Sequence, residues 1–261
     1  MELSLKGKNA VVCGSTRGIG LAIAKELALL GANCILFARN EMTLKEIVHR
    51  LPRNNGQEHG YRVADFSEPA AVKDAIETVV SKTNIHILIN NTGGPPPGSL
   101  AEASANAFEN AFRQHLINNQ LLAQCVLPGM KKEGYGRIIN IISTSVKIPL
   151  HNLGVSNTIR AAVAAWAKTL SNEVAQYNIT VNNVLPGSTQ TDRLNSLIDE
   201  TVKKKNTSRE MAEKEMTDKI PLKRFGLPEE IANVAAFLAS PAASYVNGTS
   251  IPVDGGRTGS I

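Results

Sequence analysis

The chain has 261 residues, of which 43% are hydrophobic and 20% are charged. This length is sufficient for a sizeable core, and the composition is that of a globular protein. No apolar run approaches the ~18 residues of a membrane-spanning helix. The first residues, MELSLKGKNAVVCG, lack the apolar core of a secretory signal. We therefore expect a cytoplasmic protein with no membrane partner.

Neither the charge nor the cysteines indicate a nucleic-acid or metal site. The net charge of +5 is mild, and the basic cluster Lys203, Lys204 and Lys205 lies among glutamates without interleaved aromatic residues. This pattern is typical of a solvated helix face, so we expect no nucleic-acid partner. Three cysteines, an odd number, lie in apolar runs, which indicates buried reduced thiols and no metal.

Short apolar runs alternate with helical patterns along the chain. We expect strands at residues 9–13, 33–38, 61–66, 85–90, 136–143, 178–185 and 249–254. We expect helices at 18–30, 41–50, 68–82, 104–132, 154–176 and 229–239. Most strands are near-continuous Val, Ile and Leu runs, as in strands buried on both faces. The alternation predicts a single α/β domain over residues 1–261, a Rossmann-type, doubly wound parallel sheet of about seven strands. The polar segment 188–220 is the least regular, and we interpret it as a mobile flap.

The first strand leads into a glycine-rich turn. Gly14, Gly18 and Gly20 lie between this strand and an Ala/Leu-rich helix. Glycines let the backbone approach a pyrophosphate, and a helix N-terminus offers free N–H groups and a positive dipole. A plain tight turn is the alternative. The position between strand and helix favours a dinucleotide site.

The end of the second strand indicates which dinucleotide is bound. Ala38 is followed by Arg39 and Asn40 at the place where an acidic residue would bind a ribose 2′-hydroxyl. An arginine there accommodates a 2′-phosphate instead. Together with Arg17 in the glycine turn, Arg39 favours NADP(H) over NAD(H), although both arginines would also be ordinary on a solvated surface.

The glycine spacing Gly14-x-x-x-Gly18-Ile19-Gly20 resembles the cofactor loop of the short-chain dehydrogenase/reductase family. Asn90-Asn91-Thr92-Gly93 is similar to that family's N-N-A-G segment, and Pro186-Gly187 with Thr191 to its P-G segment beside the nicotinamide. Pro221 to Gly226 and Val253 to Gly256 resemble the end of bacterial β-ketoacyl-acyl-carrier-protein reductases. The resemblance implies a cofactor site made of Gly14, Ser15, Arg17, Gly18, Ile19, Gly20, Arg39, Asp65, Asn91, Gly93, Pro186, Gly187 and Thr191.

The resemblance also implies where catalytic residues lie, and this chain departs from the family there. Family members use a Tyr as proton donor, a Lys four residues later, an earlier Ser and an Asn on the preceding helix. Counting without a gap places Ser143 on the Ser, Ser156 on the Tyr, Arg160 on the Lys and His115 on the Asn. Arg160 keeps the positive charge but stays protonated, and the serine hydroxyl is a weak acid.

The source of a proton is therefore the open question. The four tyrosines lie near the starts of expected strands, a strand length of ~17–20 Å from the site. We hypothesise that His115, or His151 in the loop after Ser143, supplies the proton, because histidine titrates near working pH. The alternative is that these histidines are structural or solvated. The stiff loop Gly93 to Gly98, with three prolines, is either a pocket wall or a connector.

Three functions remain open at this point. The first is an oxidoreductase that transfers hydride between NADP(H) and a carbonyl or alcohol, resembling a 3-oxoacyl thioester reductase. The second is a catalytically impaired dinucleotide-binding pseudoenzyme or assembly protein. The third is a dehydration or isomerisation that uses Ser143, His115 and Arg160.

The Ala-rich helix around Trp166 matches one that the family uses in subunit contacts, which implies a homodimer or homotetramer acting on a small-molecule substrate.

Overall fold

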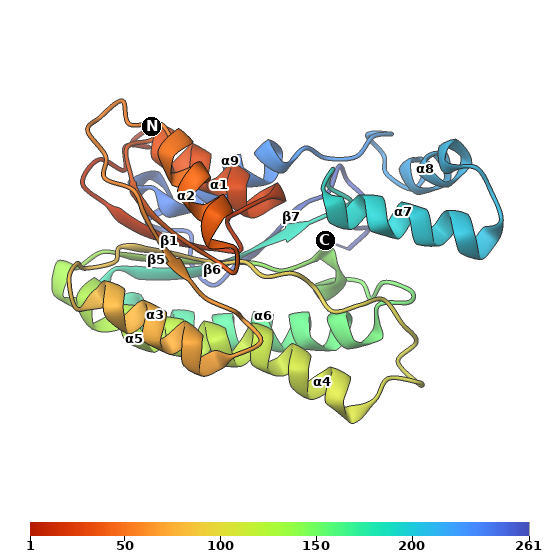
Figure 1. Ribbon diagram of the computed structural model, residues 1–261, viewed down its shortest axis with the longest axis horizontal. Coiled ribbons are helices and arrows are strands. Elements are labelled where there is room, and N and C mark those ends of the chain that lie inside the picture. Colours follow the sequence, from red (N-terminus) through yellow and green to blue (C-terminus); the bar gives the residue numbers. More distant parts are fainter. Residues whose placement is uncertain (261) are drawn as a thin grey trace.

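A computed structural model describes residues 1–260. Its centre is one sheet of seven parallel strands in the order β3-β2-β1-β4-β5-β6-β7 (Figure 1). This arrangement confirms the predicted fold class. The strands are β1 (Asn9–Cys13), β2 (Asn33–Ala38), β3 (Gly60–Val63), β4 (Ile87–Asn90), β5 (Gly136–Ile141), β6 (Ile179–Pro186) and β7 (Ser250–Val253).

Helices cover both faces of the sheet, as expected for strands that are apolar on both sides. One face carries α1 (Gly18–Leu29), α2 (Glu41–Arg50) and α9 (Pro228–Ala239), and the other carries α3 (Pro69–Val80), α5 (Asn118–Glu133) and α6 (Gly154–Val174). Each side has its own apolar core: alternate residues such as Val12 and Ile89 face the first group, and Val11 and Leu88 face the second.

The long helix expected at residues 104–132 is divided into two. α4 (Ala105–Phe112) runs into a π-helical turn (Arg113–Ile117), and α5 follows. A π turn inserts one extra residue into the helical hydrogen-bond ladder and often occurs at functional sites. Here it contains His115, which is buried.

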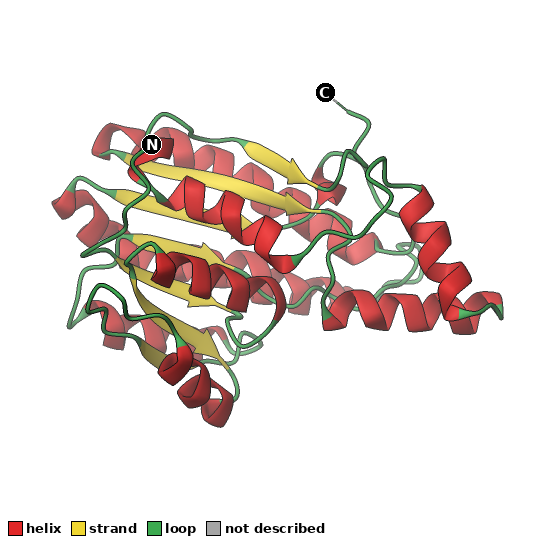
Figure 2. Ribbon diagram, turned by 90° about the horizontal axis from the view of Figure 1, so that it is seen from above, coloured by secondary structure: helices red, strands yellow, loops and turns green. Residues whose placement is uncertain are grey.

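Residues 188–220 differ from the expectation of an irregular segment. They contain α7 (Asp192–Lys205) and α8 (Arg209–Asp218), each capped by a hydroxyl, from Thr191 and Ser208 respectively. These helices have a small core of their own, formed by Leu194, Ile198, Ala212, Ile220 and Phe225. They project beyond the carboxyl ends of the strands (Figure 2). The sequence approach missed them because ten of the fourteen α7 residues and most of α8 are polar. Movement of this flap stays a prediction.

A row of side-chain amides joins β4, β5 and β6 and ends on β7. The Nδ2 atom of Asn90 donates to Oδ1 of Asn140 at 2.8 Å, and Nδ2 of Asn140 donates to Oδ1 of Asn183 at 2.9 Å. The Nδ2 atom of Asn183 then donates to the Ser250 hydroxyl at 3.0 Å. These residues are register partners in adjacent strands from β4 to β7, so the row holds these strands in register.

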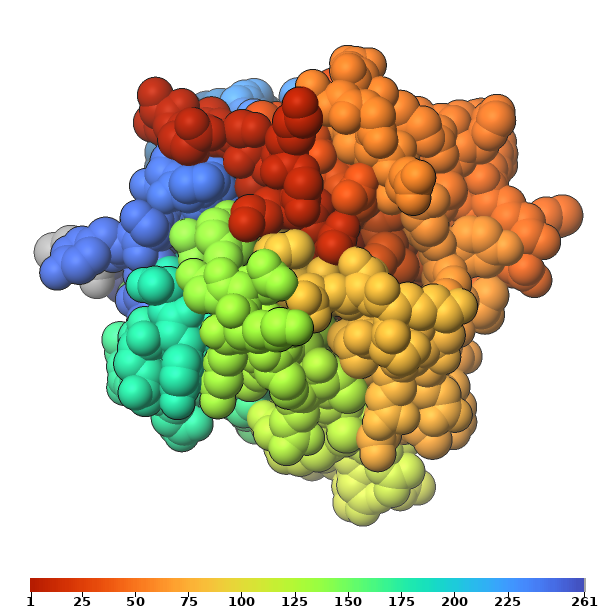
Figure 3. All heavy atoms as spheres, turned by 90° about the vertical axis from the view of Figure 1, so that its left-hand side faces the viewer, coloured from red at the N-terminus to blue at the C-terminus, as the bar shows by residue number. Residues whose placement is uncertain are grey.

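The opposite end, where the strands begin, is covered by the N-terminal segment and by turns from much of the chain (Figure 3). Tyr135 lies there, and its hydroxyl donates to the Ala239 carbonyl oxygen at 2.6 Å. Tyr61 is in the first half of β3, Tyr177 lies two residues before β6, and Tyr245 lies five residues before β7. These positions agree with the expectation that the tyrosines lie away from the carboxyl ends.

Candidate active site

The glycine turn after β1 is packed too closely for larger side chains. A Cβ atom on Gly20 would lie 2.1 Å from the Gly14 carbonyl oxygen, and one on Gly14 would lie 2.6 Å from the Asn91 carbonyl oxygen. Gly14 also has a φ of +57°, which disfavours other residues. Asn91, directly after the neighbouring strand β4, holds the turn in place. Its Nδ2 donates to the carbonyl oxygens of Cys13 and Gly14 at 3.2 Å each.

The N-terminus of α1 has the properties of an anion site. Its N-cap residue, Arg17, makes no side-chain cap bond within residues 1–260, and the first turn contains no acidic residue. α2, α4, α7 and α8 each have a side-chain cap, whereas α3 and α6 lack one as α1 does, so it is the glycine turn before α1 that distinguishes this N-terminus. Uncapped N–H groups and the helix dipole favour an anion such as a pyrophosphate. The residues present therefore fit a dinucleotide.

Ser15 lies in the same turn, but its hydroxyl is hydrogen-bonded within the protein. Its side chain is buried, and its hydroxyl donates to the Phe37 carbonyl oxygen in β2 at 3.3 Å. This contact braces the glycine turn against the neighbouring strand. A role in binding the cofactor therefore stays a prediction for Ser15.

Three charged residues that are predicted to bind the cofactor have different contacts. Arg39 is exposed directly after β2. Asp65 follows β3, and its Oδ1 accepts from the backbone N–H and the hydroxyl of Ser67 at 2.9 and 2.8 Å. These bonds lower the Asp65 pKa, and Arg39 contributes in the same direction. Arg17 instead reaches Asp192 of α7 at 3.1 Å, an exposed ion pair across the site.

The segment after β6 closes the site from the flap side. Gly187 is packed against the start of the C-terminal turn, since a Cβ there would lie 2.7 Å from Cβ of Asp254. Thr191 caps α7, and its methyl carbon would lie 3.1 Å from a Cβ on Gly18. Pro186 ends β6. Thr191 thus brings the flap into contact with the glycine turn.

The two serines occupy different environments. Ser143 follows β5 and caps a short 3-10 turn (Thr144–Val146), where its Oγ accepts from the Ser145 N–H at 3.1 Å. Ser156 lies in the first turn of α6 and is buried, with 9% of its surface exposed. Neither hydroxyl has a base beside it of the kind that would activate a nucleophile, as judged from the contacts in the described part of the chain.

Arg160, one turn after Ser156, is a buried cation. Only 8% of its surface is exposed. Its Nη1 donates to the Ile141 carbonyl oxygen at 2.9 Å, and Nη2 to the Thr92 carbonyl oxygen at 3.5 Å. Burial, and then the nearby Arg193, lower the Arg160 pKa to about 10. The guanidinium therefore remains charged near neutral pH and supplies positive charge at the ends of β4 and β5.

His115 is buried beside this cation. Its Nδ1 lies 2.6 Å from Oγ1 of Thr92, and its Nε2 has no hydrogen-bond partner within the described range 1–260. Burial, with a smaller contribution from Arg160, lowers the His115 pKa well below 6.5. His115 is consequently neutral at pH 7. His151, the other candidate, is exposed in the turn before α6.

Sequence reasoning overlooked Thr92 and Arg193. Thr92 contacts both His115 and Arg160, and the available signal was its replacement of Ala in the N-N-A-G pattern. Arg193 follows Thr191 by two residues, and its Nη2 donates to the Pro95 carbonyl oxygen at 2.7 Å. The proline loop is thereby fastened to α7. Gly93 lies between these contacts and is exposed.

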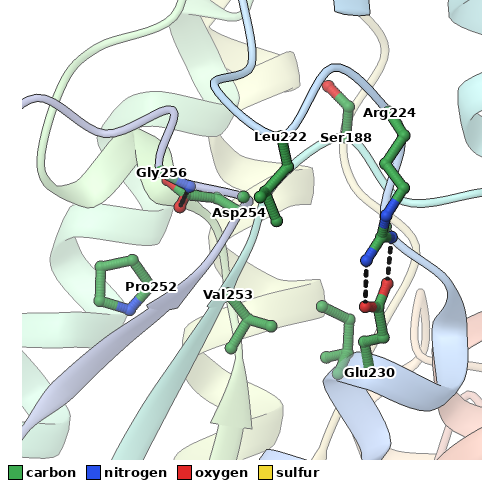
Figure 4. Close-up of a pocket in the computed structure, with 11 residues that line it drawn as sticks. Ser188, Leu222, Arg224, Glu230, Pro252, Val253, Asp254 and Gly256 are labelled. Carbon is green, nitrogen blue, oxygen red and sulfur yellow. Dashed lines mark hydrogen bonds and ion pairs between the residues drawn. The ribbon is translucent and has the colours of Figure 1, made fainter.

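Two surface pockets adjoin the site. One of about 240 Å³ is lined by Arg17, Gly18, Thr191 and residues of α1 and α9. The other, about 280 Å³, lies between the base of the flap and β7 and contains none of the predicted site residues. In it Arg224 donates to both carboxylate oxygens of Glu230, at 2.8 and 2.7 Å (Figure 4). We interpret this second pocket as structural.

The remaining expectations concern metals, thiols and membranes. No cluster of three metal-ligating side chains occurs within residues 1–260. Cys13 and Cys34 are buried thiols as expected, whereas Cys125 is only partly buried. Burial raises the Cys34 pKa to about 12. No helix in this same part of the chain is both long and apolar enough to cross a bilayer.

Comparison with known proteins identifies the family. Residues 14–258 match the family model described as enoyl-(acyl carrier protein) reductase. The chain belongs to the short-chain dehydrogenase/reductase family. It is 36% identical over 259 residues to 3-oxoacyl-[acyl-carrier-protein] reductase FabG of Aquifex aeolicus, covering 98% of this chain and 99% of that protein. The recognition made from the glycine, asparagine and C-terminal motifs is confirmed.

The names of two further members of the short-chain dehydrogenase/reductase family state that NADPH is their cofactor or was bound in the structure. The NADPH-dependent reductase BacG of Bacillus subtilis is 32% identical, with 97% of this chain and 99% of that protein covered. The structure of L-sorbose reductase from Gluconobacter frateurii, complexed with NADPH and L-sorbose, has a TM-score of 0.94 at 33% identity, with both chains fully covered. The relatives thus agree with the expectation of NADP(H).

Proposed function

We propose that this protein is an NADP(H)-dependent oxidoreductase that interconverts a carbonyl and an alcohol. The observation that carries the proposal is the uncapped N-terminus of α1 above a glycine turn in which Gly14 and Gly20 leave no room for a Cβ atom. The NADPH-dependent relatives support the choice of cofactor. Nothing in these comparisons favours the pseudoenzyme alternative.

In this proposal the pyrophosphate of the cofactor lies on the N–H groups of Gly18, Ile19 and Gly20. Arg39 binds the 2′-phosphate, because it is exposed at the end of β2 and its guanidinium suits a phosphate. Asp65, Asn91, Gly93, Pro186, Gly187 and Thr191 complete the cofactor walls. NADPH, when bound, supplies the hydride.

The proposed catalytic group is Ser143, Ser156, Arg160 and His115. The two hydroxyls orient the substrate carbonyl, and the Arg160 charge stabilises the oxygen as it becomes negative. Removal of a positioned acid usually costs ~10²–10⁴-fold in rate, so turnover is expected to be slower than in relatives with a tyrosine.

The two histidines differ in their suitability as proton donors. His115 is neutral at pH 7 and has only one ring N–H, so it does not act as an imidazolium acid. In this proposal it links Thr92 to a water. His151, exposed on the turn before α6, is in contact with solvent protons. We therefore favour His151, or water itself, as the initial donor, with His115 in a relay.

Substrate and assembly extend the proposal. The FabG relatives support a 3-oxoacyl thioester or a similar small carbonyl compound as substrate.

We also propose a homodimer or homotetramer through the side of α5 and α6, where Trp166 donates from Nε1 to Oε1 of Gln120 at 2.7 Å. Light scattering that shows a monomer would refute this assembly. The three free thiols, two of them buried, support a cytoplasmic location.

The proposal is tested in two steps. Calorimetric titration with NADPH and NADH should show binding selective for NADPH. Absorbance of NADPH is then followed with ketones, oxo acids and acyl thioesters. Oxidation of NADPH with formation of the alcohol supports the proposal, whereas product formed without net oxidation would indicate dehydration or isomerisation. NADPH binding without any turnover would indicate the pseudoenzyme.

A further inference from the structure

Two guanidinium groups converge on the loop after β4. Arg160 reaches it from α6 and Arg193 from α7, and a Cβ atom on Gly94 would lie 3.7 Å from Nη2 of each. The two nitrogens can therefore be no farther apart than twice that distance. Gly94, without a side chain, leaves this approach open.

The charges of these two arginines are not balanced by the protein. Neither forms an ion pair with any of residues 1–260, although several other arginines do. Arg17 pairs with Asp192, Arg209 with Asp199 and Glu213, and Arg224 with Glu230. Within residues 1–260, Arg160 and Arg193 thus have only carbonyl oxygens as hydrogen-bond partners. The buried Arg137 has only carbonyl partners too, but it is alone and stacks on the Tyr135 ring.

Leaving two like charges together is unfavourable, particularly when one is buried. Arg160 is 8% exposed, and the presence of Arg193 adds to the burial that lowers its pKa. An anion between two guanidinium groups removes this repulsion and satisfies their remaining N–H donors. A planar guanidinium matches a carboxylate with two parallel hydrogen bonds, which a lysine ammonium does not.

We propose that Arg160 and Arg193 bind a carboxylate of the substrate, so that the preferred substrates are oxo acids whose carboxylate lies close to the ketone. The inference rests on the proposed oxidoreductase function and specifies its substrate class. Arg160 lies one helical turn from Ser156, in the proposed catalytic group, and comes from α6, not from the turn before α1 where the cofactor phosphates are expected. Arg193 comes from the flap, so substrate binding also holds α7 against the proline loop.

The first experiment compares acids with their esters. Pyruvate, acetoacetate and levulinate, each beside its methyl ester, are tested as substrates with NADPH, together with acetoacetyl-CoA, whose ketone has no carboxylate beside it. We expect kcat/KM for at least one acid to exceed that of its ester by about 30-fold, equivalent to the loss of one charge-assisted contact. Equal values for acids and esters would overturn the proposal.

The second experiment assigns the effect to Arg193. Arg193→Gln should lower kcat/KM for the preferred acid about 10- to 100-fold more than for its ester, and Arg193→Lys should recover part of the difference. Arg209→Gln is the matched control on the same flap, since its partners are Asp199 and Glu213. Equal losses for acid and ester in Arg193→Gln would contradict a carboxylate contact.

Two outcomes separate this inference from the proposed function and from a cofactor contact. If no substrate is turned over although NADPH binds, the proposed function fails, but the anion site can still be tested by calorimetry with malonate in the presence of NADP⁺. Malonate binding that Arg193→Gln abolishes supports the anion site. No malonate binding overturns it. If Arg193→Gln weakens NADPH itself by about tenfold or more, the arginine binds a cofactor phosphate, which also overturns the inference.

Discussion

The Nδ1 atom of His115 lies 2.6 Å from Oγ1 of Thr92, and the Thr92 carbonyl oxygen accepts a bond from Arg160. One residue therefore joins the π-helical turn before α5 to the buried cation of α6. This relationship places an uncharged imidazole beside a permanent positive charge. Burial lowers the pKa of His115, and the nearby Arg160 charge adds to this effect, so the protonation state of this histidine can be tested by measurement.

His115 should make stability depend on pH. Its pKa is well below 6.5 in the folded protein and near 6.5 in the unfolded chain, so the unfolded state binds more protons between these values. The free energy of unfolding should therefore fall as pH decreases below about 6.5, by up to about 1.4 kcal/mol per pH unit. His115→Asn should remove this part of the slope in urea unfolding measured from pH 7.5 to 5.

The control is internal, because His59 and His86 also have lowered pKa values and are present in both proteins. Their contribution cancels when the wild-type curve is compared with that of His115→Asn. Parallel stability curves would show that His115 is not neutralised by burial.

Gly20→Ala should damage the cofactor turn. The added Cβ would lie 2.1 Å from the Gly14 carbonyl oxygen, so the turn must shift. We expect a loss of about 1–3 kcal/mol in stability and at least about 100-fold weaker NADPH binding by calorimetry. Gly60→Ala is the matched control, since no atom of residues 1–260 lies within 4 Å of its Cβ position. Unchanged NADPH affinity in Gly20→Ala would contradict the proposed cradle.

Asn140→Ala should destabilise the sheet. Asn140 is fully buried and lies between Asn90 and Asn183 in the amide row. Its truncation leaves a donor of Asn90 and an acceptor of Asn183 without partners, which should cost about 2–5 kcal/mol in urea unfolding. Asn54→Ala, in an exposed loop, should change stability by less than about 0.5 kcal/mol. A similarly small effect at Asn140 would mean that the row contributes little.

Arg39→Asp should change the cofactor preference. Replacing the guanidinium with a carboxylate opposes a 2′-phosphate and suits a 2′-hydroxyl. NADPH affinity should fall about 10- to 100-fold and NADH affinity should not fall, as measured by calorimetry. Arg53→Asp, also exposed but on the loop after α2, provides the charge-matched control. An equal effect of the two variants would assign the loss to net charge alone.

The core elements of the fold are those that the sequence predicts best. β1, β2 and α2 coincide with the expected ranges, since each has a strong periodic or apolar pattern and clear boundaries. The expected third strand continued to residue 66, but β3 ends at Val63, because Asp65 turns to bond with Ser67. The π turn at His115 has no sequence signature of its own, since the apolar periodicity on either side continues through it.

The site was predictable only in part. Glycines and strand ends identify a cofactor turn because backbone geometry requires particular residues at particular places. The Arg160–Arg193 convergence was not predictable, since Arg193 reaches the loop only through the way α7 packs. Whether a histidine is charged is equally invisible in sequence, because it depends on the depth at which the π turn buries His115.

The central claim is that this chain transfers hydride although Ser156 and Arg160 replace the tyrosine and lysine that the family uses. The most direct measurement supplies NADPH deuterated at the transferable position of C4 with the panel of oxo acids, ketones and thioesters, and analyses the products by mass spectrometry. The account predicts an alcohol that carries one deuterium on the carbinol carbon. Tight binding of NADPH with no deuterium in any product would contradict it.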